Sequence, residues 1–510
     1  MRARQVDPTA LERLHRDPVR SFAEQAFSRA AGAPLVAGNS VRILRDAGEN
    51  YPAWLDAIGA AQRSICFEAY ILANDKVGQR FMDALRAKAS AGVRVRLLYD
   101  WFGGVGEGTR RLVAPATRDG VEVRCFNAPR LDSPLGWLHR DHRKSIVVDE
   151  VVGFVTGLCV ADRWAGDPAR GKDPWHDTGV EVRGPAVADL SRAFAQVWSE
   201  SGEPIPEHEL PLPGAIPNAG DVSLRVVATA PSTTGVYRLD QLIAALARKR
   251  LWLTDPYFVG IATYVQALRA AALDGVDVRF LVPGQSDVAW LKPLSRAGYR
   301  PLLEAGVRVW EWNGPMLHAK CAVADGRWSR VGSSNLNLAS WMGNHELDIA
   351  VEDDAFGRAM EEVYLDDLEH STEIVLGARR PRRVRPPAFR HRIADHGARR
   401  ASSGLAAAGA MRLGHTVGAA LGGFRVLGPA EAKLLAGAAA LVAALSVVAV
   451  LWPHLVAVPL GVFGLWLAIA LAVKALKLRR ARRAVSIPEP GPAEQRGADE
   501  APPRPAAPRS

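Results

Sequence analysis

Two eight-residue segments decide the fold of this chain: HRKSIVVD at residues 142–149 and HAKCAVAD at residues 318–325. Both read His-x-Lys-x4-Asp, and the composition predicts only about 0.014 such matches by chance. Residues i and i+2 of a strand share a face, so His142 should project with Lys144, and His318 with Lys320. The aspartate of each motif has the opposite parity, and we expect it to anchor the strand end (Asp149 and Asp325).

Each motif follows one copy of an internal repeat. The first copy combines a helical apolar period at 55–72 with two strands introduced by Gly-Val at 91–100 and 119–126. The second copy repeats this order at 239–258, 274–283 and 305–312. Helices that alternate with short β-branched strands predict α/β units with mainly parallel strands.

This repeat predicts an α/β fold of two pseudo-symmetric lobes. The Pro-rich stretch 203–220 is the expected junction. We place the first lobe at 39–205 and the second at 220–375. Residues 1–38 are predicted to form an amphipathic N-terminal arm of unknown purpose.

If the two copies pack face to face, two imidazoles and two ammonium groups converge. Such a site suits a phosphodiester, because lysines neutralise the phosphoryl oxygens while one histidine attacks phosphorus and the other protonates the leaving alkoxide. A single His-x-Lys strand is usually a surface feature, but its duplication favours a catalytic role. We expect no metal and no cofactor, because a lysine beside each histidine repels a cation.

Four downstream residues could complete the site. Ser333 and Asn335, in the stretch GSSN at 332–335, could donate hydrogen bonds to a phosphoryl oxygen. Glu346 and Asp177 are carboxylates placed to orient an imidazole. Taken singly, each could equally be a turn residue or a solvated acid.

The charge of +10 lies outside the lobes. Residues 379–433 hold 12 basic and two acidic residues, 474–483 hold six basic residues, and 1–378 carry a net charge of −5. A negative charge on the lobes disfavours nucleic-acid binding, which depends on Lys/Arg contacts. The basic segments flank the uncharged run 434–473.

This uncharged run predicts a transmembrane helical hairpin, because Pro453-His454 divides it into two 19-residue halves, 434–452 and 455–473. Arg-rich flanks favour the cytoplasm for both ends and for the lobes, and they attract anionic lipid. The hairpin would thus make the protein a multi-pass membrane protein. The Pro- and Ala-rich residues 484–510 are expected to be a disordered tail.

Together these segments resemble the phospholipase D superfamily, in particular its bacterial cardiolipin synthase-like branch. The resemblance covers about 39–367 and includes YDWFGG (99–104) and WHDTGVEVRGPAV (175–187). It implies two α/β/α sandwich lobes related by a pseudo-twofold axis, one active site between them, no metal, and a ping-pong reaction through a phosphohistidine.

The resemblance also implies a role for each site residue. His142 would be the nucleophile and His318 the general acid and base. The phosphate would be held by Lys144, Lys320, Ser333 and Asn335, and the histidines would be oriented by Asp177 and Glu346. Two features depart from the family: Cys159 stands where an Asn is usual, and the hairpin is C-terminal.

Three functions are therefore open. The leading one is a phosphatidyltransferase that makes cardiolipin from phosphatidylglycerol, or from phosphatidylglycerol and another phospholipid. The second is a phospholipase D that releases phosphatidic acid. The third is an inactive membrane protein that binds anionic lipid, a possibility raised by Cys159.

Overall fold

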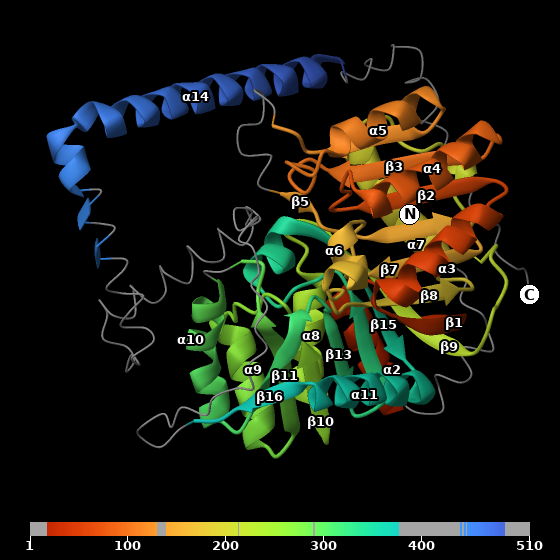
Figure 1. Cartoon of the computed structure of the whole chain (residues 1–510), viewed down its shortest axis with the longest axis vertical. Coiled ribbons are helices and arrows are strands. Elements are labelled where there is room, and N and C mark those ends of the chain that lie inside the picture. The colour runs from red at the N-terminus through yellow and green to blue at the C-terminus, as the bar shows by residue number, and fades with distance from the viewer. Residues whose placement is uncertain are drawn as a thin grey trace, which may run out of the picture. The chain divides into compact units, whose positions relative to one another are not determined.

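The computed structural model describes residues 18–129, 139–212, 214–288, 291–376, 439–440, 443–444 and 446–484. The two lobes form one compact unit, and the C-terminal residues from 445 onward belong to a second unit. Figure 1 shows the first lobe in red to yellow and the second in green to cyan.

The first lobe is built from the following described elements: β1 (Val36–Arg45), α3 (Asp46–Ala60), β2 (Ser64–Ala69), α4 (Lys76–Ser90), β3 (Arg94–Asp100), α5 (Thr109–Arg118), β4 (Glu122–Phe126), β5 (Arg140–Asp141), β6 (Ser145–Val148), β7 (Val152–Thr156), α6 (Asp162–Ala165), the short 3-10 helix η2 (Pro168–Arg170), β8 (Thr178–Arg183) and α7 (Val187–Glu200).

The second lobe follows the same plan: β9 (Val222–Thr229), α8 (Gly235–Leu246), β10 (Arg250–Thr254), α9 (Ala262–Leu273), β11 (Asp277–Gln285), α10 (Leu291–Glu304), β12 (Arg308–Met316), β13 (Cys321–Ala324), β14 (Trp328–Gly332), the short π-helix η4 (Ala339–Gly343), β15 (Asn344–Glu352), α11 (Asp354–Glu369) and β16 (Ser371–Ile374).

The strands of both lobes join into one sheet. Its order is β16-β12-β11-β10-β13-β14-β15-β9-β1-β8-β7-β6-β2-β3-β4, and β9 and β1 pair antiparallel at its centre. From this central pair the order runs through equivalent strands in both directions, which places the pseudo-twofold axis between β9 and β1. The predicted duplication of an α/β lobe is confirmed.

The strands are less parallel than the sequence predicts. Along the main path of the sheet, β2–β3–β4 and β10–β11–β12 pair parallel, and the other neighbours run antiparallel. The short strand β5, which lies off this path, pairs parallel with β15. A parallel pair needs a long crossover, which the helices supply after β2, β3, β10 and β11. The motif strands β6 and β13 instead turn back at once, through Asp149, Glu150 and Asp325 with positive φ.

Strand β6 shows how helices cover both faces of the sheet. Ile146 and Val148 face one core with Trp54 of α3 and Phe81 of α4. Val147 points the other way, into a core shared by α7, α11 and strands of both lobes. This shared core holds the lobes together, because neither lobe can bury that face alone.

Part of the predicted N-terminal arm belongs to the second lobe. Helix α2 (Pro18–Ala31) ends at Ala31, which packs with Ala33 into the core of α8 and its strands. The Arg225 guanidinium donates a hydrogen bond of 3.2 Å to the Glu24 carbonyl oxygen. Strand β1 then begins inside the predicted arm, at Val36.

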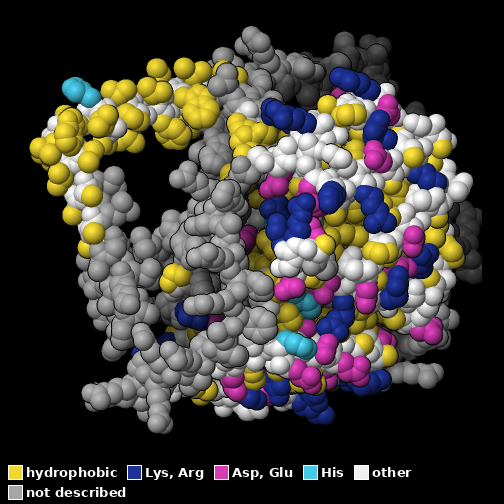
Figure 2. All heavy atoms as spheres, in the orientation of Figure 1, with side chains coloured by type: hydrophobic (Ala, Val, Ile, Leu, Met, Phe, Trp, Pro, Cys, Tyr) yellow, Lys and Arg dark blue, Asp and Glu magenta, His cyan; other side chains and the backbone are white. Residues whose placement is uncertain are grey.

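The C-terminal unit contains helix α14 (Pro453–Ala484). Its segment Pro453–Val473 has a mean hydropathy of 2.4, and it is the single helix in the described part of the chain long and apolar enough to cross a membrane. Figure 2 shows mostly hydrophobic side chains along this segment. The predicted first span, 434–452, lies partly outside the described residues, so the hairpin stays a prediction. The basic segment 379–433 and all of the predicted tail except Ala484 lie wholly outside them.

Candidate active site

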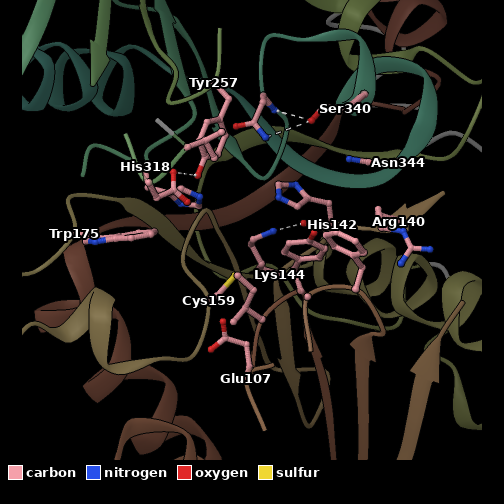
Figure 3. Close-up of a pocket in the computed structure, with 18 of the residues that line it drawn as sticks. Glu107, Arg140, His142, Lys144, Cys159, Trp175, Tyr257, His318, Ser340 and Asn344 are labelled. Atoms are coloured by element: carbon pink, nitrogen blue, oxygen red, sulfur yellow. Dashed lines mark hydrogen bonds between the residues drawn. The ribbon is translucent and has the colours of Figure 1, made fainter. Parts of the chain in front are cut away.

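The two motifs meet because each binds the backbone of the opposite lobe. The His142 N–H donates to the His345 carbonyl oxygen at 2.9 Å, and the His318 N–H donates to that of His176 at 2.7 Å. Both histidines line one pocket of about 120 Å³ between the lobes. Figure 3 shows the two imidazoles on opposite sides of this pocket, with Lys144 beside His142.

The histidines are oriented across the lobes. Nδ1 of His142 lies 2.9 Å from Oε2 of Glu346, and Nδ1 of His318 lies 2.7 Å from Oδ2 of Asp177. Each imidazole therefore takes its carboxylate from the other lobe. All four side chains are buried, so these contacts are shielded from water and strong.

Further donors hold the two carboxylates in place. Glu346 accepts from the Ser333 hydroxyl at 2.5 Å and from the Asn344 amide at 3.2 Å. Asp177 accepts from the Trp164 indole at 3.2 Å and from the Thr178 N–H at 2.9 Å.

Ser333 thus differs from the expectation that it faces the phosphate. Its hydroxyl is directed at Glu346, and the residue does not line the pocket. The reason is that β14 ends at Gly332, so the strand parity assumed for Ser333 and Asn335 does not hold. Asn335 does line the pocket, and its Oδ1 has no hydrogen-bond partner among the described residues.

The lysines place two buried ammonium groups beside the imidazoles. Lys144 Nζ donates to the His142 carbonyl oxygen at 2.5 Å and lies 5.0 Å from the centre of the Tyr70 ring. Lys320 Nζ donates to the His318 carbonyl oxygen and lies 2.9 Å from Nδ1 of its ring. The carboxylates of Glu346 and Asp177 balance these two cations. Lys144 lines the pocket, where it can bind an oxygen of an anionic ligand, whereas Lys320 is fully buried behind the pocket wall.

Burial and the nearby lysines set the protonation of the site. Burial lowers the pKa of His142, and burial together with Lys320 lowers the pKa of His318 to about 3, so both rings are neutral near pH 7. Burial lowers the pKa of Lys320 to about 8, although Asp177 opposes the shift. Burial raises the pKa of Asp177 and Glu346, but the facing histidines and lysines outweigh it and lower both values.

The motif aspartates stand outside this chemistry. Asp149 accepts from the N–H groups of residues 62, 63 and 64 at 2.7 to 2.8 Å, and Asp325 accepts from those of 248, 249 and 250 at 2.8 to 2.9 Å. Neither lines the pocket. Each aspartate anchors the end of its motif strand, as its parity predicts, and so has a structural rather than a catalytic role.

Aromatic residues around the imidazoles were missed by the sequence analysis. The rings of Tyr70 and Tyr257 lie 4.8 and 5.7 Å from those of His142 and His318, and Trp164 and Trp175 lie 5.4 and 5.7 Å from His318. Each tyrosine comes shortly after a strand, β2 or β10, that ends a stretch of the repeat predicted to be helical (55–72 and 239–258). Their equivalent places in the two copies could have indicated them.

Cys159 lines the pocket and is buried. Its place after β7 matches that of Asn335 after β14. Burial raises the pKa of its thiol, which disfavours a thiolate nucleophile. The side chain facing the pocket at this position is therefore a weak donor.

Comparisons with known proteins agree with this geometry. The family model described as "Cardiolipin synthase, PLD-like domain" matches residues 54–198 and 240–367. The chain is 34% identical to a cardiolipin synthase of Alkalihalophilus pseudofirmus over 67% of this chain and 68% of that protein. It is 33% identical to cardiolipin synthase A of Pseudomonas fluorescens over 69% and 73%.

A solved structure shares the fold. The crystal structure of phosphatidylserine synthase from Haemophilus influenzae aligns with a TM-score of 0.55 and 14% identity, over 69% of this chain and 92% of that chain.

Proposed function

Because this chain belongs to the cardiolipin synthase family of phospholipase D-like proteins, we propose that it is a phosphatidyltransferase that makes cardiolipin. The substrates are two phosphatidylglycerol molecules, or one phosphatidylglycerol and another phospholipid. The observation that carries this proposal is the crossed pair of His–carboxylate contacts flanked by two buried lysines. This arrangement supplies a nucleophile, an acid and an anion site in one pocket.

In the first half-reaction, Lys144 and Lys320 bind the non-bridging oxygens of the donor phosphodiester. When the anionic phosphodiester binds and draws Lys320 away, His318 takes up a proton from solvent and becomes an imidazolium. Nε2 of His142 then attacks phosphorus, the bond from phosphorus to the glycerol oxygen breaks, and the His318 imidazolium gives its proton to that oxygen. Glycerol leaves, and a phosphatidyl-histidine remains.

In the second half-reaction, His318 removes the proton from a headgroup hydroxyl of the second phosphatidylglycerol. That oxygen bonds to phosphorus, and the bond to His142 breaks with its electron pair returning to the imidazole. The product is cardiolipin, and both histidines are restored.

The choice of His142 as nucleophile rests on what surrounds each ring. Glu346 contacts Nδ1 of His142, and no described residue forms a hydrogen bond with Nε2 of that ring. In contrast, Lys320 lies within 3.2 Å of both ring nitrogens of His318. An anion that draws Lys320 away from His318 raises the proton affinity of that ring, as an acid requires.

Phospholipase D activity is the competing function, with water as the acceptor. The test is to incubate the purified protein with phosphatidylglycerol vesicles and separate the products. Cardiolipin with glycerol supports the proposal, and phosphatidic acid with glycerol supports hydrolysis. Absence of both products would favour the inactive lipid-binding protein.

The proposal places the active site at the cytoplasmic surface of the membrane. Residues 434–473 span the bilayer as a hairpin, and the flanking basic residues contact anionic lipid. Support comes from the apolar segment Pro453–Val473 and from the face of the lobes seen in Figure 2, where basic and acidic side chains are intermixed. Bilayer and phospholipid are therefore the expected partners, and nucleic acid is not.

Truncation after Arg400 tests this topology. It should release the protein from membranes and lower the rate on vesicles far more than on a short-chain soluble phosphodiester, because the anchor raises the effective concentration without changing the chemistry. Protease cleavage of 488–510 from the periplasmic side would contradict the hairpin.

A further inference from the structure

One carboxylate of the pocket has no part in the mechanism above. Asp287 follows β11 in the second lobe and lines the pocket on the side of His318. Its Oδ1 accepts from the Tyr257 hydroxyl at 2.9 Å. The carboxylate also accepts a hydrogen bond from its own backbone N–H, but no other described residue donates to Oδ2, and Asp287 is exposed. A fixed carboxylate with one free oxygen is prepared to accept a hydrogen bond from a ligand.

The alcohol must bind on this side. In the proposed mechanism His318 protonates the leaving hydroxyl and deprotonates the attacking one, so both lie next to it. This side is lined by Tyr257, Trp164 and Trp175, whose rings pack around His318. These flat walls leave room for a small headgroup, and Asp287 is the polar group fixed at its edge.

Nearby charges decide which headgroup suits Asp287. On the same side of the pocket, Arg163 forms a 3.0 Å ion pair with Glu107 and lies 5.8 Å from the centre of the Trp175 ring. Burial raises the pKa of Asp287, and the Tyr257 hydrogen bond with the charges of Arg163 and Lys320 opposes the shift. A cationic headgroup would approach Arg163, Lys144 and Lys320, and their repulsion would cancel much of its attraction to one carboxylate.

A neutral polyol does not suffer this repulsion. We propose that Asp287, held by Tyr257, forms the subsite that binds the hydroxyls of a glycerol headgroup and so selects a neutral polyol over an ammonium-bearing headgroup as the acceptor. This inference rests on the proposed function. Asp287 is then a specificity-determining residue that contacts the substrate and leaves the proton transfer to His318.

The first experiment uses a short-chain phosphatidyl p-nitrophenol as the donor, so that release of p-nitrophenol reports phosphoenzyme formation without a glycerol leaving group. Glycerol, ethanolamine and water then compete for the phosphoenzyme. The wild-type protein should transfer to glycerol at least tenfold more than to ethanolamine at equal concentrations. Asp287→Ala should lower the ratio of glycerol product to hydrolysis product about tenfold, and Asp287→Asn less, because an amide oxygen still accepts a hydrogen bond.

Asp274→Ala is the matched control, because Asp274 is an exposed aspartate of the same lobe outside the pocket. It should leave both the release of p-nitrophenol and the product ratio unchanged. An Asp287→Ala variant with the wild-type ratio would overturn the inference. So would a wild-type protein that prefers ethanolamine, since the carboxylate would then select a cation.

A binding measurement separates this inference from the proposed function. If the wild-type protein releases no p-nitrophenol, the phosphatidyltransferase proposal fails. The Asp287 subsite can still be tested by measuring lipid binding to the inactive His142→Ala variant. There, dihexanoyl phosphatidylglycerol should bind about tenfold more tightly than dihexanoyl phosphatidylethanolamine, and the added change Asp287→Ala should remove that preference. Equal affinities in both variants would refute the subsite.

Discussion

The two lobes have the same strand order yet surround their histidines differently. Each lysine donates to the carbonyl oxygen of its own histidine, but Lys320 also lies 2.9 Å from Nδ1 of the His318 ring, and no such contact joins Lys144 to the described ring of His142. His318 lies among tryptophans, and the lobe of His142 offers Cys159 where the other offers Asn335. Duplication thus reproduced the scaffold, while a few substitutions beside each imidazole could give the two halves different roles.

The crossed contacts teach a second lesson. His142 takes Glu346 and the carbonyl of His345, and His318 takes Asp177 and the carbonyl of His176. Neither lobe by itself contains both members of either active-site pair, His142–Glu346 or His318–Asp177. The following changes test how far the two halves are equivalent.

Loss of either histidine should have the largest effect. His142→Ala and His318→Ala should each lower kcat at least 1000-fold, because each removes one partner of a shared mechanism. Circular dichroism should show both variants folded, and the exposed His208→Ala is the control that keeps the rate.

Trapping the intermediate then separates the two roles. A phosphoenzyme quenched during turnover should map to His142. Mapping to His318 would reverse the assignment, and a near-normal rate in either alanine variant would exclude the two-histidine mechanism.

Replacement of the carboxylates should have the next largest effect. Glu346→Gln and Asp177→Asn should each slow the reaction about 100-fold or more, because a neutral amide no longer stabilises the imidazolium form of its partner. Since the contacts are crossed, Glu346→Gln should mainly slow phosphoenzyme formation at His142. Single-turnover kinetics can measure both half-reactions.

Ser333→Ala is the companion change. It should slow the same half-reaction as Glu346→Gln by a smaller factor, because the hydroxyl acts through that carboxylate. If Ser333→Ala instead weakens substrate binding without slowing this step, the result would support the original prediction that Ser333 contacts the phosphate directly.

Asn335 and Cys159 test the asymmetry of the donors. Asn335→Ala should cost about 2–4 kcal/mol of transition-state stabilisation, by analogy with the donors of an oxyanion hole. Cys159→Ala should change the single-turnover rate less than about threefold, and Cys159→Asn should preserve or raise it. A Cys159→Ala variant as inactive as His142→Ala would instead make the thiol a participant.

The smallest expected effect is a decline of kcat/KM at alkaline pH, caused by the titration of Lys320 in the second lobe. The pKa of Lys320 is lowered to about 8, so its cation is present below that pH and is lost as the pH rises through it. Therefore kcat/KM should fall above pH 8, and kcat should fall less because a bound phosphate stabilises the cation.

Lys320→Arg checks this assignment, because a guanidinium stays protonated over the whole range. Its lower but measurable rate should lack the alkaline decline. A decline that persists unchanged in this variant would assign the titration to another group.

The sequence predicted much of the fold because its evidence is local or repeated. Helical periods and Gly-Val strands indicated two α/β lobes, and the parity of Asp149 and Asp325 placed them at strand ends, where each accepts three N–H groups. The prediction of a mainly parallel sheet was wrong, because the three-residue turn after each motif strand leaves no room for a crossover.

The motif spacing by itself selected His142, Lys144, His318 and Lys320, since residues two apart in an extended chain project together. Only the tertiary structure decided their partners. Glu346 is 204 residues from His142 and Asp177 is 141 residues from His318, and Asp287 reaches the pocket through a loop that carries no motif. Such contacts depend on how two sheets join at β1 and β9, and no local pattern encodes that junction.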